Sequence, residues 1–283
     1  MSSSDESAAP HRRLVIAADP DDPVAIDVRD FVIDSGHDAV ILDVFDAAQS
    51  FTVTFDGSVA RVEPVVPLFL RLPAPPLLRL SFDAEFQLNE CLAQLWAVAA
   101  LTPAPVINRP APGGLGGLVS PSAALTELRA GQPGGSPEIF SARPVRPSVP
   151  PADDDGVTWW VQDLDTWRAH PWPDPVDGPA PAPGAVGPFR SRWSDPDPVF
   201  ESVVVLGDQA WRSSPVDLDR LDLERRSVEI VARLRLDLAA VVWRVSSGLD
   251  RAWPVAVEPF PDAEQLRMVW LGLGPRLVKV LFP

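Results

Sequence analysis

The sequence contains few of the residues that build covalent or metal-bound frameworks. Its 283 residues include one cysteine, three histidines, no tyrosine and a single lysine, at position 279. One cysteine excludes a disulfide framework and any zinc cluster built on cysteines, and His11, His37 and His170 show no metal-ligand spacing. No apolar run reaches the roughly 18–20 residues of a membrane-spanning helix.

Positive charge is also scarce. The 24 lysine and arginine residues are outnumbered by 39 aspartate and glutamate residues, which gives a formal net charge of −15. Proteins that bind a nucleic-acid backbone or an anionic lipid surface need clustered positive charge, so this balance argues against both partners. The first residues are acidic and rich in serine, without the apolar core of a signal peptide. We expect a soluble, cytoplasmic protein with a disordered tail at 1–12.

Proline, by contrast, is abundant, with 34 residues, and 46% of the chain is hydrophobic. This content suffices to bury a core, and at roughly 100–200 residues per domain the length allows one large domain or two to three lobes. The distribution of proline and glycine predicts three parts. These are an N-terminal α/β lobe at 13–110, a Pro/Gly-rich central lobe at 111–200 and a C-terminal lobe at 201–283.

The N-terminal lobe begins with a βαβ pattern. HRRLVIAA at 11–18 predicts a buried strand, the apolar spacing over 24–32 predicts a helix, and AVIL at 39–42 predicts a second strand. The Asp-Pro cluster at 19–23 supplies the helix N-cap, and Gly36 supplies a left-handed cap at its end. A unit of this length implies a parallel strand pair with a right-handed crossover.

Four further elements complete this lobe. Apolar residues alternate on either side of Asp56-Gly57, which predicts a β-hairpin over 51–62 with its turn at that pair. PLFLRL at 67–72 predicts a short strand. The 3–4 spacing of apolar residues over 81–100 predicts a long helix, and VIN at 106–108 predicts a brief strand.

The central lobe has the weakest pattern. The glycines at 113–117 predict a flexible loop, and the alternative is a phosphate-binding loop made of backbone N–H groups. The pattern at 120–130 predicts a helix. VTWWV at 157–161 is typical of a strand, within a run that holds nine prolines between 147 and 183. The proline-rich stretch 171–188 is either a lid or a plain linker.

The C-terminal lobe returns to clear patterns. SVVVLGDQAWR at 202–212 predicts a hairpin, and the apolar spacing over 217–237 predicts a helix. AAVVWRV at 239–245 and WPVAVE at 253–258 predict a strand pair, and 263–281 predicts a closing helix interrupted near Gly-Leu-Gly-Pro. The fold class is therefore α+β, or mixed α/β.

One carboxylate stands out by its position. Glu258 ends an apolar strand directly before Pro259. A carboxylate leaving a buried strand at a proline turn is well placed to hold Mg²⁺ through oxygen. The alternative is an ordinary surface glutamate at a strand end.

The order of these segments resembles the ATP-grasp superfamily, in the branch of glutathione-synthetase-like and ribosomal-protein glutamate-ligase-like enzymes. The opening βαβ unit is similar to the N-terminal lobe of these ligases. PLFLRL, the long helix and VINRP are similar to the strand, helix and N-x-P motif that lead into the central lobe of the family. SVVVLGDQAW is similar to the hairpin R-v-x-V-v-G-d-x-v, and LRLDLAAVVWRV…WPVAVEPFP to the metal-holding pair lgLdyagvDfi…vlEvNxxP. The resemblance covers most of the chain and implies antiparallel sheets in the central and C-terminal lobes.

The sequence departs from the family pattern at the phosphate-binding positions. The family grips the ATP phosphates with two lysines, whereas no lysine precedes Lys279 in this chain. Gln162 stands at the place of the second lysine, and Ser122 stands near the place of the first. Glu201 replaces the basic residue that begins the family's hairpin.

The metal-binding positions are degenerate as well. The family's triad is Asp, Glu and Asn, and Glu258 matches its glutamate. Phe260 stands where the asparagine is expected, and either Val242 or Trp243 stands where the aspartate is expected. One Mg²⁺ ligand of the three is therefore retained.

Arginine would supply part of the missing positive charge. Arg190 and Arg192 fall near the family's adenine hinge, and Arg212 and Arg244 lie on nearby strands. A guanidinium makes a forked contact and not a compact point charge, so the exchange is not neutral. With ATP and Mg²⁺ as the implied cofactors, these arginines and Gln162 form the implied nucleotide site.

Two functions follow from the resemblance and its departures. The first is a degenerate ATP-grasp protein that has lost most of the phosphate-transfer residues and acts as a non-catalytic binding or partner subunit in a biosynthetic pathway. The alternative is an active, atypical ATP-dependent carboxylate–amine ligase that forms an amide or peptide bond through an acyl phosphate. Each implies a protein partner or a small-molecule or peptide substrate. A third reading is an unrelated α/β protein.

Overall fold

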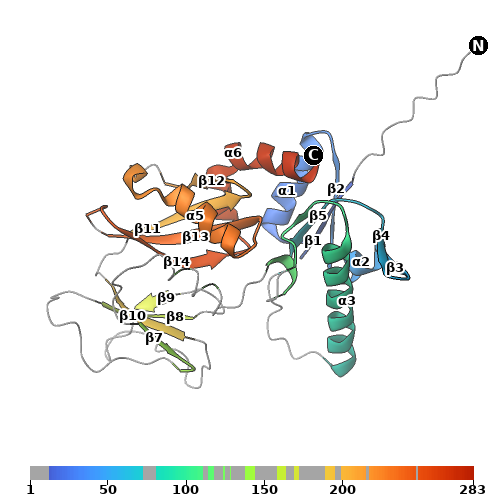
Figure 1. Cartoon of the computed structure of the whole chain (residues 1–283), viewed down its shortest axis with the longest axis horizontal. Coiled ribbons are helices and arrows are strands. Elements are labelled where there is room, and N and C mark those ends of the chain that lie inside the picture. Colours follow the sequence, from blue (N-terminus) through green and yellow to red (C-terminus); the bar gives the residue numbers. More distant parts are fainter. Residues whose placement is uncertain are drawn as a thin grey trace, which may run out of the picture.

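Three four-stranded sheets form the framework of the chain (Figure 1). A computed structural model describes residues 13–72, 81–110, 114–117, 124, 128, 138–143, 158–163, 169–171, 189–194, 199–214, 217–246 and 248–283. The side chains of 138–140, 158–160, 162–163, 169–171 and 192–194 lie outside this description, as do the predicted tail at 1–12 and residues 172–188 of the proline-rich stretch. In the described part of the chain, no helix is long and apolar enough to cross a membrane.

The first sheet is parallel, as the βαβ pattern predicts, and its order is β2-β1-β5-β6. Its elements are β1 (Arg13–Ala18), α1 (Pro23–Asp34), β2 (Asp38–Leu42), β5 (Leu68–Arg71) and β6 (Val106–Ile107). The carboxylate of Asp22 begins α1 because it accepts hydrogen bonds from the N–H groups of Val24 and Ala25. Gly36, at a φ of 87°, follows the end of α1 in the left-handed conformation that we predict.

A hairpin and two helices complete this part of the chain. They are α2 (Val44–Gln49), β3 (Thr52–Asp56), β4 (Val59–Glu63) and α3 (Phe82–Leu101). The predicted long helix and hairpin are confirmed, although the hairpin turn lies one residue later than predicted, at 57–58. The sequence pattern does not predict α2, because six residues carry too little periodicity. Both helices pack around Phe51, Leu68 and Leu95 against the first sheet.

The central sheet is antiparallel, with the order β7-β10-β8-β9. Its strands are β7 (Glu138–Ser141), β8 (Thr158–Asp163), β9 (Ala169–Pro171) and β10 (Phe189–Ser194). The strand predicted at 157–161 is confirmed as β8. Ala124 and Leu128, the described part of the helix predicted at 120–130, are helical and buried.

In its described residues, 114–117, the glycine stretch is not the flexible loop that its composition predicts. Its described end, η1 (Leu115–Gly117), is a buried 3-10 turn. A Cβ on Gly117, which has a φ of +82°, would lie 2.6 Å from Leu236 Cδ2 and 2.7 Å from Asn108 Cβ. Glycine is required there because the turn lies directly against neighbouring side chains.

The C-terminal sheet is antiparallel, with the order β12-β11-β13-β14, and it confirms the predicted hairpin and strand pair. The elements of this part are β11 (Val199–Leu206), β12 (Gln209–Arg212), η2 (Asp219–Leu221), α5 (Leu223–Arg233), β13 (Leu238–Val245), β14 (Ala252–Glu258) and α6 (Ala263–Leu281).

Two helix predictions in this part are wrong in detail. The segment 217–237 is not one helix, because the left-handed backbone of Asp222, at a φ of 53°, separates η2 from α5. The closing helix α6 continues through its proline without interruption. Its Gly272 and Gly274 allow the rings of Trp211 and Phe31 to approach closely, so the glycines serve packing and do not break the helix.

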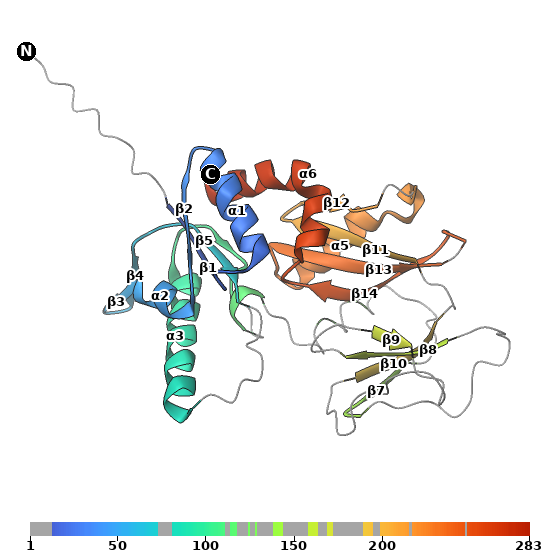
Figure 2. The same cartoon turned by 180° about the vertical axis from the view of Figure 1, so that it is seen from behind.

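The two faces of the C-terminal sheet contribute to different cores. Val203 and Val205 of β11 pack against α5, whereas Val204 of β11 and Ala240 of β13 pack with α6. This second core continues into β1 and α1, and Figure 2 shows α6 beside α1. The first and third sheets therefore share one core, which fixes their relative position.

Candidate functional site

Glu258 ends β14, where a short connection leads into α6. In an antiparallel pair, residues directly opposite each other point to the same face of the sheet. Glu258 is paired with Ala240, whose side chain packs in the core that α6 covers. Its carboxylate therefore lies on the α6 face of the C-terminal sheet.

The carboxylate of Glu258 is bound by a glutamine of α6. Gln265 Nε2 donates to Glu258 Oε2 at 2.6 Å and to Ser202 Oγ at 3.2 Å. The same glutamine closes the N-terminal cap of α6, since its Oε1 accepts from the N–H of Asp262 while the Asp262 carboxylate accepts from the N–H of Gln265. Burial raises the pKa of Glu258; the Gln265 hydrogen bond lowers this pKa, and the Asp262 charge raises it.

Residues 259–262, which connect β14 to α6, are held by side chains from the first part of the chain. Asn108 Nδ2 donates to the carbonyl of Pro259 at 3.3 Å, and Arg71 Nη1 donates to the carbonyl of Pro261 at 2.8 Å. The ring of Phe260 packs against Gly116, where a Cβ would lie 3.0 Å from it. These contacts set the position of the strand end that carries Glu258.

The strand register decides which of two neighbouring residues lies beside Glu258. Val242 is on the Glu258 face, whereas Trp243 is fully buried on the α5 face. There Trp243 Nε1 donates to Ser227 Oγ at 2.8 Å, and the guanidinium of Arg226 lies 4.3 Å from the ring centroid. The position beside Glu258 is therefore occupied by an apolar side chain.

Two of the predicted nucleotide-binding arginines lie near β14. Arg190 is buried on β10, and its Nη1 donates to the carbonyl of Val255 at 3.4 Å, so it joins the central and C-terminal sheets. Arg244 on β13 is paired with Trp253 on β14, and its guanidinium lies 4.8 Å from the ring centroid. Both cations therefore reach the edge strand that ends at Glu258.

Arg212 lies apart from these two. It is paired with Val203, whose side chain packs against α5, so it is on the face opposite Glu258. Its guanidinium forms ion pairs with Glu224 at 2.6 Å and Asp219 at 2.9 Å. The structure therefore does not bring Arg212 together with Glu258.

The remaining predicted residues are on the central sheet. Gln162 on β8 is paired with Arg190, and Arg192 on β10 is paired with Trp160. Only the backbone is described for Gln162 and Arg192.

Glu201, the residue in place of a family basic residue, is also buried. It is 2% exposed on β11, and its Oε1 accepts from the N–H of Ser214 at 3.2 Å. Burial raises its pKa, while the hydrogen bonds of Ser214 and the charge of Arg212 lower it. Glu201 packs on the α5 side and does not add to the Glu258 site.

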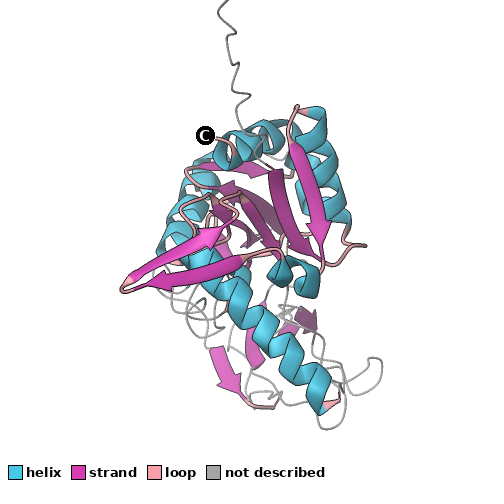
Figure 3. Cartoon of the chain, turned by 90° about the vertical axis from the view of Figure 1, so that its right-hand side faces the viewer, coloured by secondary structure: helices cyan, strands magenta, loops and turns pink. Residues whose placement is uncertain are grey.

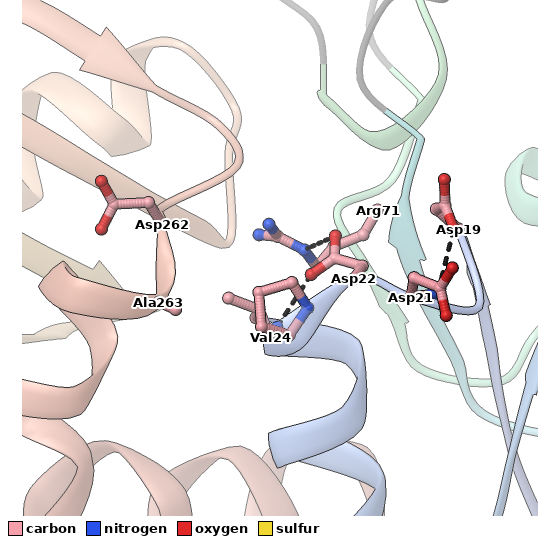
Figure 4. Close-up of a pocket in the computed structure, with 8 residues that line it drawn as sticks. Asp19, Asp21, Asp22, Val24, Arg71, Asp262 and Ala263 are labelled. Carbon is pink, nitrogen blue, oxygen red and sulfur yellow. Dashed lines mark hydrogen bonds and ion pairs between the residues drawn. The ribbon is translucent and has the colours of Figure 1, made fainter.

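A pocket of about 320 Å³ opens where the first sheet meets α6 (Figure 4). Its carboxylates come from the β1–α1 turn and from the N-cap of α6: Asp19, Asp21, Asp22 and Asp262. Arg71 Nε donates to Asp22 Oδ2 at 2.8 Å, and the two side chains are each 11% exposed. The pocket is thus acidic, and Arg71 spans from its wall to the connection after β14.

A scan against protein-family models finds no match, and neither does a search of curated protein sequences. Solved structures do match, over nearly the whole chain. The ATP-grasp ligase PsnB, complexed with minimal precursor, Mg and ADP, has a TM-score of 0.61 at 15% identity over 95% of this chain and 96% of that one. The macrocyclase MdnC bound with precursor peptide MdnA, from Microcystis aeruginosa MRC, has a TM-score of 0.63 at 13% identity over 95% and 98%. A RimK domain ATP-grasp protein from Sphaerobacter thermophilus DSM 20745 has a TM-score of 0.52 at 13% identity over 96% and 100%.

The chain has the ATP-grasp fold. A parallel N-terminal sheet followed by two antiparallel sheets confirms the fold that the resemblance implies, and the reading as an α/β protein of another fold is wrong. At 13–15% identity, the likeness to these structures shows the fold alone. The chemistry of the site therefore has to be argued from the residues of this chain.

In this chain, the described side chains at the end of β14 do not fit Mg²⁺. The ion demands near-octahedral coordination by oxygen and is usually bound through one or two carboxylates. Glu258 has one oxygen bound to Gln265, while Val242 and Phe260 offer only carbon at the neighbouring positions. Within the described residues, no three His, Cys, Asp or Glu side chains are grouped to hold a metal ion. We assign no step to a magnesium ion here.

The sequence patterns miss three residues that position this part of the ATP-grasp fold: Arg71, Asn108 and Gln265. The spacing Asp262-x-x-Gln265 is a capping-box signal and would have identified Gln265 as part of a helix start. No local signal identifies its contact with Glu258, because that contact depends on where α6 returns over the sheet. Arg71 and Asn108 act on residues more than a hundred positions away, so spacing alone does not reveal them.

Proposed function

We propose that this chain is an ATP-dependent carboxylate–amine ligase that acts on a peptide. A substrate carboxylate would take the terminal phosphoryl group of ATP, releasing ADP, and an amine would then displace phosphate from the acyl phosphate to form an amide. The extent of the likeness carries this proposal, since 95–96% of the chain follows solved ATP-grasp structures. Two of those structures contain a precursor or precursor peptide, and one also contains Mg and ADP. We assign the reaction to the cytoplasm.

Arginine replaces lysine in this proposal. Arg190, Arg192 and Arg244 are cations on the central and C-terminal sheets, and guanidinium groups make forked contacts with phosphate oxygens. Losing one strong electrostatic group typically raises a reaction barrier by roughly 2.7–4 kcal/mol. With both lysines and two family metal ligands replaced, we expect turnover to be slow compared with a ligase that retains them.

A second candidate is a degenerate ATP-grasp protein that binds a peptide or a partner protein without catalysis. The hydrogen bond from Gln265 to Glu258 favours this candidate, because it gives the carboxylate a structural role at the start of α6. The apolar Val242 beside it favours the same candidate. In this form the chain would be the partner subunit of an active ligase in a biosynthetic pathway.

Calorimetric titration with a non-hydrolysable ATP analogue, with and without Mg²⁺, tests the two candidates. Micromolar binding that requires Mg²⁺ supports the ligase. An absence of binding at millimolar nucleotide supports the non-catalytic protein, and recovery of a partner by pull-down would then be expected.

For a protein that binds nucleotide, ADP release in the presence of carboxylate- and amine-bearing peptides completes the test. Glu258→Gln tests whether this carboxylate takes part in the reaction. The thermal midpoint should barely change, because the new amide oxygen still accepts from Gln265, so a loss of ADP release would report a role in catalysis and not a loss of folding. Glu264→Gln, on the exposed side of the first turn of α6, is the matched control and should turn over normally. Normal ADP release by Glu258→Gln would show that Glu258 has no part in catalysis.

A further inference from the structure

The pocket between the first sheet and α6 lies where open α/β sheets bind their ligands. The order β2-β1-β5-β6 places β2 and β5 on opposite sides of β1. The helices that follow β1 and β5 lie on opposite faces of this sheet, α1 in the core shared with α6 and α3 in the other core (Figure 3). The connections after β1 and β5 therefore diverge and leave a crevice at the carboxyl ends of the strands. Asp19 follows β1, Arg71 ends β5, and both line the pocket.

Hydrogen bonds hold the walls of this pocket, so the site is formed before a ligand binds. On one wall, both carboxylate oxygens of Asp22 are engaged, one by the first N–H groups of α1 and the other by Arg71. Arg71 is 11% exposed, and its Nη1 donates to the carbonyl of Pro261 at 2.8 Å. On the other wall, Asp262 and Gln265 close the cap of α6.

The pocket carries an excess of negative charge. Four carboxylates and one guanidinium line it, which leaves a formal charge of −3. In Figure 4, Asp262 lies on the α6 side, and Asp19 and Asp21 lie on the side of the β1–α1 turn. The N-termini of α1 and α6 would favour an anion, but each is already bound to a carboxylate of this chain, Asp22 or Asp262. The occupant that fits the remaining charge is a cation.

The lining favours an organic cation over a metal ion. Within the described residues, no three His, Cys, Asp or Glu side chains are grouped to hold a metal. The volume of about 320 Å³ is at the lower end for small-molecule sites, so the pocket takes a group the size of one side chain. Pro23, Val24 and Ala263 add apolar lining beside the carboxylates. An apolar stem that ends in a positive charge, as in lysine and arginine, matches both parts of this lining.

We propose that this pocket recognises a basic side chain, lysine or arginine, of the peptide on which the chain acts. The inference rests on the peptide of the proposed function, and it holds for both the catalytic and the non-catalytic candidate. The basic group is recognised in the pocket and does not react there, because the surrounding carboxylates stabilise a protonated amine, which has no lone pair to attack an acyl phosphate. Gln265, which closes the Asp262 cap, also binds Glu258, so the recognised side chain lies near the end of β14.

NMR titration of the full chain with two short peptides tests the proposal. The first is an acetylated and amidated glycine–lysine–glycine peptide, and the second carries norleucine in place of lysine, which keeps the stem and removes the charge. The lysine peptide is expected to shift the backbone N–H signals of Asp21, Val24 and Ala263, with a dissociation constant of about 1 mM. This constant should increase as salt is added, and the norleucine peptide should leave the signals unchanged.

The double variant Asp21→Asn/Asp262→Asn removes one charge from each side of the pocket. Asparagine at 262 still caps α6, so folding is retained. Each lost charge should weaken binding of the lysine peptide about two- to fivefold, the effect of an exposed ion pair. Asp34→Asn/Asp38→Asn is the matched control, because these exposed residues lie beyond the far end of α1, about 18 Å along the helix from Asp22, and it should bind like the wild type.

Three results would overturn the proposal. They are no shift at about 20 mM lysine peptide, equal binding of the norleucine peptide, and equal binding by the Asp21→Asn/Asp262→Asn variant and the wild type. The titration uses no nucleotide, so its failure is distinct from a failure of the proposed function. A chain that binds the ATP analogue but not the lysine peptide would contradict this proposal alone.

In a catalytically active chain, a kinetic measurement separates recognition from reaction. Asp21→Asn should raise the KM for a lysine-bearing peptide more than it lowers kcat, because the side chain that it contacts is not the one that reacts. A lower kcat at unchanged KM would contradict the recognition role.

Discussion

Asn108 shows how one buried side chain can join parts of a chain that are far apart. Its Oδ1 accepts from the N–H groups of Asp237 at 2.9 Å and Leu238 at 2.7 Å, and its Nδ2 donates to the carbonyls of Leu238 at 2.8 Å and Pro259 at 3.3 Å. Asn108 is 2% exposed and its two hydrogen bonds to Leu238 are buried, so its removal would leave buried polar groups of Leu238 without this partner. Asn108 thereby links the end of β6 to the start of β13 and to the connection after β14.

We expect Asn108→Ala to lower the free energy of unfolding by about 2–4 kcal/mol, because it leaves buried backbone groups without partners and opens a small cavity. Urea denaturation measures this change. Asn89→Ala, at an exposed position of α3, is the control and should stay within about 0.5 kcal/mol of wild type. Equal effects of the two substitutions would show that the Asn108 hydrogen bonds contribute little.

At the scale of elements, a short turn and a helix cap set the positions of the sheets relative to each other. The η1 turn lies between Asn108, Leu236 and the ring of Phe260, and it is close-packed because Gly116 and Gly117 have no side chains. The C-terminal sheet carries α5 on one face and α6 on the other, and the N-terminus of α6 is closed by the Asp262–Gln265 pair. The turn and the cap together determine where the end of β14 lies.

Gly117→Ala should lower stability by about 2–4 kcal/mol, because the new Cβ would meet Leu236 and Asn108 in a conformation that already disfavours alanine. Gly57→Ala is the matched control. Gly57 has a φ of +61°, but a Cβ there would have nothing within 4 Å. Its substitution by alanine therefore costs only the strain of the left-handed backbone, about 1 kcal/mol. Thermal denaturation of both variants isolates the contribution of packing, and equal losses would contradict the close contact at Gly117.

At the scale of the whole molecule, acidic groups dominate. The net charge is −15, and burial raises the pKa of three carboxyl groups, those of Glu201, Asp237 and Glu258. A carboxyl group whose pKa is higher in the folded than in the unfolded chain binds more protons when folded. The free energy of unfolding therefore rises as the pH falls toward the folded pKa values, and it stops rising below the unfolded values.

We expect the thermal midpoint to be higher at about pH 5.5 than at about pH 7.5. Repulsion among the surplus acidic groups also lowers the thermal midpoint as the pH rises, and salt screens this repulsion. Differential scanning calorimetry at high salt therefore isolates the buried carboxyl groups. Glu201→Gln should reduce the dependence on pH and raise the midpoint at pH 7.5, whereas an unchanged profile would show that Glu201 is not desolvated as its burial indicates.

The local patterns predict most elements correctly, and their failures have physical causes. The βαβ unit, the long helix and the C-terminal strand pair follow from periodicity, which is a property of neighbouring residues. The interruption expected in α6 is wrong because Leu273 and Leu277 bury one side of the helix, and packing there outweighs the effect of Pro275. The left-handed Asp222 that separates η2 from α5 has no pattern of its own.

The sequence by itself determined the order of the elements with clear periodicity, the acidic balance and the absence of lysine before Lys279. These are properties of composition and of near neighbours, and no fold can change them. The tertiary structure alone decided that Val242 and not Trp243 lies beside Glu258, that Arg212 is on the opposite face, and that Gln265 binds the carboxylate. Strand register and helix docking decide such questions, because a shift of one residue moves every side chain to the other face and the contacts that prevent the shift come from distant segments.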